Sequence, residues 1–202
     1  GTLDANTTGT KNNALGNYAL STNTTGANNV AIGHESLVNN TTASNNVAIG
    51  HTALFANTTG AYNVALGALA LDANTTADNN TAIGYATLTS NTTGIHNAAF
   101  GSAALFSNTT ANYNTAVGRE SLALNTTGAD NTATGYKALY TNTTGANNTA
   151  VGKGALTANT TANDNVSVGE QSMKANTTGA ENVALGQNAL QANTTASYNT
   201  AL

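Results

Sequence analysis

The fold is decided by the stretch Asn29-Val30-Ala31-Ile32-Gly33. Three β-branched or small residues between Asn and Gly are typical of a short β-strand that turn residues bound on both sides. Side chains alternate along a strand, so Val30 and Ile32 share one face and Ala31 takes the other. We expect Val30 and Ile32 to point into the core.

The same pattern returns every 17 residues along the whole chain. The consensus unit reads L-x-x-N-T-T-G/A-x-x-N-V/T-A-I/L/V-G-x-x-A/S. The 202 residues hold eleven full units, which start at Leu3, and a truncated twelfth, which starts at Leu190. A fixed short period is the signature of a solenoid or array. We therefore predict that residues 1–202 form a single repeat array, a segment of a longer fibre.

The period and its residues select the fold class. A 17-residue period sustains no heptad, which excludes a coiled coil, and Asn-Thr-Thr with Gly in every unit opposes long helices. The sequence predicts an all-β fold, a parallel β-solenoid (β-roll or β-helix) with one coil per 17-residue repeat and coils about 4.8 Å apart. A second short strand is expected to begin at Ser36-Leu37-Val38, with Leu37 pointing in and Val38 out.

Two invariant columns are expected to form the turns and ladders of the coil. Stacked asparagines can join their side-chain amides along a β-stack, and Gly adopts a positive φ without steric strain. Proline is absent from the chain, as expected where each proline would remove a ladder hydrogen bond. The residues are Asn12, Asn29, Asn46 and Asn63 in the first column, and Gly33, Gly50, Gly67 and Gly84 in the second.

The middle strand position is also nearly constant, because it is Ala in every unit except at Ser167. A solvent-facing position would vary, so we expect another surface to approach this column closely. That surface is either a second chain or the far side of the same coil. The expected assembly face contains Ala31, Ala48, Ala65, Ala82 and Ala99.

The Asn-Thr-Thr corner matches the acceptor pattern for N-glycosylation. A second interpretation is that Asn and Thr recur because they form ladders at a corner, and glycans only about 5 Å apart would be crowded. The candidate acceptors are Asn6, Asn23, Asn40, Asn57, Asn74, Asn91, Asn108, Asn125, Asn142, Asn159, Asn176 and Asn193, with further matches at Asn39, Asn79, Asn147 and Asn165.

Composition argues against several functional classes. Charged residues make up 7% of the chain, against about 25% in average domains. With a net charge of −4 and no basic run, we expect no nucleic-acid partner, and no apolar stretch reaches the length of a membrane span. There is no cysteine, and the acidic residues have no fixed spacing, so we expect no metal and no cofactor. No nucleophile, base and orienting group recur together, so we expect no enzyme activity.

A few side chains repeat in outward columns. His34 and His51 occupy the same column of consecutive coils, and two histidines alone make a poor metal site. Aromatic side chains can serve as sugar platforms or interchain contacts, or can be exposed without any function. One aromatic column holds Phe55, Phe106 and Tyr140, and another holds Tyr62, Tyr113 and Tyr198.

The strands at 29–33, 63–67, 80–84 and 182–186 resemble the head repeats of trimeric autotransporter adhesins. Those repeats also place a small residue two positions after Gly-x, as Ser36, Ala70 and Ala189 do here. The array is similar, too, to repeat regions of phage tail fibres. The resemblance implies a left-handed β-roll, a homotrimer, and attachment to surfaces. This chain departs from the adhesin pattern in its longer coil, which adds an Asn-Thr-Thr-Gly corner.

We therefore expect a structural shaft or head segment of an extracellular fibre or adhesin, at a cell or virion surface, with a surface glycan as receptor. Two alternatives stay open. One is a single-chain glycosylated extracellular filament. The other is an ice-binding β-solenoid, because flat threonine arrays occur on some antifreeze solenoids, although adjacent threonines face opposite ways in an extended segment.

Overall fold

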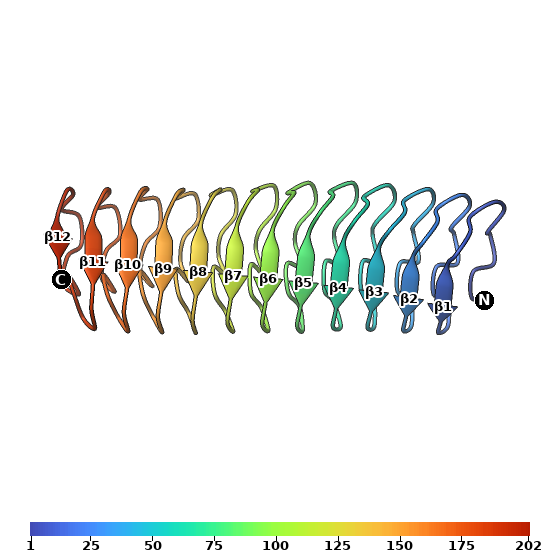
Figure 1. Ribbon diagram of the computed structural model, residues 1–202, viewed down its shortest axis with the longest axis horizontal. Helices are drawn as coiled ribbons and strands as arrows, with labels where there is room; N and C mark the ends of the chain where they lie inside the picture. Colours follow the sequence, from blue (N-terminus) through green and yellow to red (C-terminus); the bar gives the residue numbers. More distant parts are fainter.

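The structure is a computed structural model that describes residues 1–202, and its strands form one parallel sheet along a straight rod (Figure 1). Strand order in the sheet follows chain order, and the chain contains no helix. The predicted all-β parallel solenoid with one coil per repeat is confirmed. The strands are β1 Asn13–Leu15, β2 Val30–Ile32, β3 Val47–Ile49, β4 Val64–Leu66, β5 Thr81–Ile83, β6 Ala98–Phe100, β7 Thr115–Val117, β8 Thr132–Thr134, β9 Thr149–Val151, β10 Val166–Val168, β11 Val183–Leu185 and β12 Thr200–Ala201.

Neighbouring coils pair at a constant offset of one repeat. Ala31 of β2 pairs with Ala48 of β3, and the same register holds between all the other strands. Of 130 backbone hydrogen bonds, 108 lie outside the strands. Many of them also join successive coils, as when the Leu20 N–H donates to the Ser36 carbonyl at 3.0 Å. The ladder therefore runs around most of the coil and not only along the sheet.

The segment after each strand is a turn. Glu35 and Leu37 have φ of 54° and 50°, in the left-handed region that bulky residues seldom enter. The predicted second strand at Ser36-Leu37-Val38 was therefore wrong, because these left-handed residues bend the chain. Leu37 does point inward and is fully buried, while Val38 lies at the surface, as expected.

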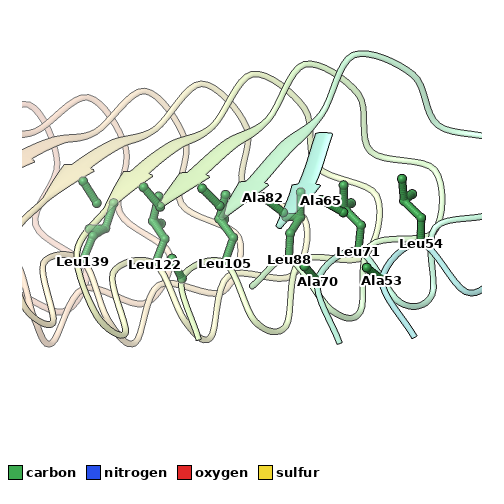
Figure 2. Packing of buried hydrophobic residues seen from close by; sticks show 14 of the residues in the cluster. Ala53, Leu54, Ala65, Ala70, Leu71, Ala82, Leu88, Leu105, Leu122 and Leu139 are labelled. Carbon is green, nitrogen blue, oxygen red and sulfur yellow. The ribbon is translucent and has the colours of Figure 1, made fainter. Parts of the chain in front are cut away.

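The interior is filled by one column of leucines and two columns of small residues. Figure 2 shows Leu54, Leu71, Leu88, Leu105, Leu122 and Leu139 in a row along the rod. The small residues are the middle strand position, such as Ala65, and the position before each leucine, such as Ala70. All three columns are fully buried in the inner coils. A narrow coil of this kind has room for one large side chain per turn.

The strand side chains face the opposite way from our prediction. Ala31 is fully buried, whereas Val30 is half-buried and Ile32 is 38% exposed. The expected core position of Val30 and Ile32 was wrong, because the leucine column leaves room for little more than a methyl group beneath the sheet. Ser167 replaces Ala at this position because its hydroxyl donates to the Ser172 carbonyl at 2.8 Å, inside the coil.

Candidate functional site

The asparagine of each Asn-Thr-Thr corner points into the coil and forms an unbroken ladder. Asn57 donates from Nδ2 to Asn40 Oδ1 at 3.1 Å, and Asn74 donates to Asn57 Oδ1 at 3.0 Å. The second N–H of each amide donates to the backbone carbonyl three residues later, as from Asn57 to Gly60 at 2.9 Å. The ladder connects all twelve coils, from Asn6 to Asn193.

The second asparagine column meets the first at the same backbone carbonyl. Asn29 Nδ2 donates to the Ala43 carbonyl at 2.9 Å, and Asn40 Nδ2 donates to it at 3.0 Å. Asn46 accepts at Oδ1 from the Asn63 backbone N–H at 2.9 Å. A ladder is present at Asn12, Asn29, Asn46 and Asn63, but each side-chain oxygen in it accepts mainly from the backbone N–H of the next asparagine and not from its amide. Two asparagine columns therefore close each corner from inside.

This geometry overturns the glycosylation hypothesis for the corner asparagines of the inner coils. From Asn23 to Asn176, every corner asparagine is fully buried. Both N–H groups of each are already used, and an N-linked sugar would replace one of them and occupy space inside the coil. The Asn-Thr-Thr repeat is explained by the ladder, as in the second interpretation.

The strand-end glycines have a steric reason to be glycine. Gly84 has φ of 137° and Gly33 has φ of 130°, as predicted for this column. A Cβ at Gly84 would lie 2.7 Å from the Gly101 carbonyl carbon of the next coil, and a Cβ at Gly33 would lie 2.5 Å from the Gly50 oxygen. A side chain here would separate the coils, so glycine sets their spacing.

The alanine column cannot be an assembly face. Ala31, Ala48, Ala65, Ala82 and Ala99 are all fully buried within the single chain. The surface that approaches them is the far side of the same coil, the second of the two alternatives. The prediction failed because invariance reflected packing inside the coil and not contact with another chain.

Two surfaces with a repeating composition face outward, one uncharged throughout and one invariant. The first, which we call the strand face, is formed by the first and third residues of each strand, such as Val47 and Ile49. No strand contains a charged residue.

The second surface, which we call the threonine row, is formed by the second Thr of each corner. The hydroxyl groups of these threonines form no hydrogen bond within the chain. The threonine row consists of Thr8, Thr25, Thr42, Thr59, Thr76, Thr93, Thr110, Thr127, Thr144, Thr161, Thr178 and Thr195, all exposed.

The first Thr of each corner behaves differently. Thr24 Oγ1 donates to the Thr41 carbonyl at 3.0 Å, and the same bond joins every successive pair of coils. This threonine is therefore explained by stacking. The threonine row is the one invariant column that no contact within the chain explains.

Two pairs of outward rings stack along the rod. The rings of His34 and His51 lie 5.3 Å apart at an interplanar angle of 8°, and those of His96 and Tyr113 lie 5.2 Å apart. Tyr62, Tyr113 and Tyr198 are exposed, and Phe106 is exposed as well. No group of three His, Cys, Asp or Glu side chains is close enough to hold a metal ion.

Charged residues gather on one stretch of the rod, which the sequence analysis missed. Glu120 pairs with Arg119 at 2.7 Å and with Lys137 at 3.3 Å. Partial desolvation acts to raise the pKa of Glu120, but hydrogen bonds from Lys137 and Arg119 outweigh it and lower that pKa. The hydrogen bond to Glu120 raises the pKa of Lys137 in turn.

Next to this network lies a cavity of about 200 Å³, which we call the cationic notch. It is lined by Tyr136, Lys137, Lys153, Gly154, Thr157, Gln171 and Lys174. These residues come from four consecutive repeats, so they are far apart in the sequence. An alignment of the repeats would have pointed to this place in the sequence, because Gly154 is the only glycine at its repeat position in the eleven full units.

The structure has no helix that could span a membrane. Comparisons with known protein families, with curated proteins and with solved structures found no match to this chain. The function of the chain must therefore be inferred from the arrangement of its own residues.

Proposed function

We propose that this chain is a structural segment, a shaft or head, of an extracellular fibre or adhesin at a cell or virion surface. The observation that supports it is the continuous axial ladder. Both asparagine columns and the first threonine column bond each coil to the next. Twelve coils at about 4.8 Å spacing form a rod of roughly 55–60 Å, and its uniform cross-section suits a spacer.

Location is tested by immunogold electron microscopy on intact source cells or particles, with antibody raised against this chain. Label on filaments outside the unbroken surface is the expected result. Label that appears only after the cells or particles are opened would contradict the proposal.

The strand face is the part of the rod best suited to self-association. Exposed apolar surface marks interaction sites, and Ile32, Leu66 and Phe100 are each about two-fifths exposed. Eleven strands of three residues present two outward side chains each, within the roughly 20–30 residues per partner of a standard interface. The shared 17-residue period lets copies pack in register. The partner we propose is therefore a further copy of this chain, in the trimer that the adhesin resemblance implies.

Self-association is tested by light scattering on the wild type and on the triple variant Ile49→Lys, Leu66→Lys, Ile83→Lys. The variant should be monomeric with an unchanged far-UV circular dichroism spectrum, because buried lysines oppose association. The control places three lysines on the same coils in the threonine row, at Thr42, Thr59 and Thr76, and should stay oligomeric. A wild type that is monomeric at all concentrations would reject the oligomer and leave the single-chain filament.

Ice binding is the second candidate function, and the threonine row is the observation that favours it. Twelve exposed threonines with unused hydroxyls lie in one line, about 4.8 Å apart. Thermal hysteresis of the wild type should exceed that of a variant with Thr76→Lys, Thr93→Lys and Thr110→Lys. Absence of thermal hysteresis in the wild type would remove this candidate.

A further inference from the structure

The cationic notch exists because one coil lacks a side chain that the other coils have. In the column of Gly154, the neighbouring coils carry Lys137 and Gln171. Gly154 has φ of 67°, close to the 54° of Lys137 and 55° of Gln171, so the backbone is the same and only the side chain is missing. The gap is therefore a local departure from the repeat and not a consequence of the fold.

Positive charge is concentrated around this gap. The chain has five Lys and Arg residues and a net charge of −4, yet Lys137, Lys153 and Lys174 all line the notch. Lys137 is paired with Glu120, and Lys153 is paired with Glu170 at 3.1 Å. Lys174 forms no ion pair, so one lysine remains available to a ligand. Arg119, which lies 5.8 Å from the centre of the Tyr136 ring and pairs with Glu120, adds a fourth cation beside the notch.

The notch also offers groups that suit the body of a sugar. The Tyr136 ring is 40% exposed and lies within 5.5 Å of Lys137 Nζ, and aromatic rings and lysine stems both provide apolar surface. Gln171 Oε1 accepts from Gln191 at 3.1 Å, which leaves the Gln171 amide N–H groups free to donate. Thr157 donates its hydroxyl proton to the Gly154 carbonyl at 2.6 Å, so its oxygen can accept.

We propose that the cationic notch binds a single residue of an acidic saccharide. The anionic group lies against Lys174, the ring lies against Tyr136, and its hydroxyls bond to Gln171 and Thr157. A cavity of about 200 Å³ is smaller than the roughly 300–1,000 Å³ of sites for drug-sized ligands, which fits one sugar ring. The anion is a carboxylate, as in a uronic acid, or a sulfate ester. This inference goes beyond the proposed rod function and is tested without it, since the isolated chain suffices.

The direct test is a titration of the chain, followed by amide NMR, with D-glucuronate and with glucose 6-sulfate as the two acidic probes. Neutral D-glucose and acetate serve as probes that lack the charge or the ring. We expect millimolar binding of at least one acidic sugar, with shifts at the Gly154 and Gln171 amides that weaken as salt screens the charges. Equal binding of glucose or of acetate would overturn the acidic-saccharide assignment, and so would the absence of binding by both acidic sugars.

Two variants test whether the acidic sugar binds in the cationic notch. Gly154→Gln restores the side chain present in the next coil, and a Cβ at Gly154 would lie 3.2 Å from Thr157 Oγ1, a tight contact with a side chain that can rotate. The Gly154→Gln variant should abolish the amide shifts, while Ala103→Gln, at the same position of a distant coil, should not.

Lys174→Gln should weaken binding about tenfold, the effect of losing one charged contact, whereas Lys11→Gln should leave binding unchanged. Full binding by Gly154→Gln, with a circular dichroism spectrum like that of the wild type, would overturn the site.

Discussion

The side-chain amide of Asn40 donates to Asn23 Oδ1 at 2.9 Å and to the Ala43 carbonyl at 3.0 Å, with no exposure to solvent. One buried amide thus joins two coils and closes its own corner. Buried polar groups that are fully paired specify a unique arrangement, and an unpaired one is destabilising. The interior of this rod is therefore specified as much by amides as by leucines.

We expect Asn91→Ala to destabilise the rod by about 1–3 kcal/mol for each buried group left without a partner. The change removes the bond to Asn74 and the acceptor of Asn108. Urea unfolding and hydrogen exchange in the adjacent coils measure the effect. Thr93→Ala, in the exposed threonine row, is the control and should change stability by less than about 0.5 kcal/mol. Equal stability of the two variants would contradict a structural role for the ladder.

Replacement of Gly84 by Ala or Val should lower the melting temperature, more strongly for Val, because φ of 137° is strained for any side chain and its Cβ meets the next coil. Gly154→Ala is the matched control. Its φ of 67° is one that this column tolerates, and the nearest atom to its Cβ is the Thr157 hydroxyl oxygen at 3.2 Å, on a side chain that can rotate, and not the backbone of the next coil. Differential scanning calorimetry should therefore separate the two glycines, and identical melting temperatures would show that the close approach at Gly84 is unimportant.

Ala82→Leu should destabilise the single chain by about 1–3 kcal/mol through overpacking, since Ala82 is fully buried beneath the sheet. The loss should not depend on protein concentration, because the clash lies within one coil. Ile83→Leu, on the strand face, should have little effect on unfolding. A loss that appears only where the chain self-associates would instead place Ala82 at an interface.

Asp72→Asn should stabilise the chain at neutral pH. Burial raises the pKa of Asp72 above its ordinary value of 3.8, and the charge of His51 offsets only part of this effect. A carboxyl with a raised folded-state pKa destabilises the fold once it ionises, so the penalty grows as pH rises through that pKa and vanishes below 3.8. Melting temperatures of variant and wild type should converge in acid. The same change at the exposed Asp164 is the control, and an Asp72→Asn gain that persists in acid would contradict this cause.

Much of the fold follows from the repeat itself. Strands such as Val30–Ile32, the positive φ at Gly33 and the ladder through Asn29 were all predictable. A strict 17-residue period places identical residues above one another, and their local turn and hydrogen-bonding preferences then act in every coil at once. The period therefore predicts the register, the parallel sheet and the absence of helix.

What only the tertiary structure decided is which surfaces face inward and which residues meet. Alternation put Ala31 and Ile32 on opposite faces but could not say which face was inside, because that depends on how much space Leu37 leaves when the coil closes. The left-handed turn at Leu37 is likewise held by bonds to the next coil and not by local preference. The cationic notch unites Lys137 and Lys174, since stacking turns a separation of two repeats in the chain into proximity along the rod.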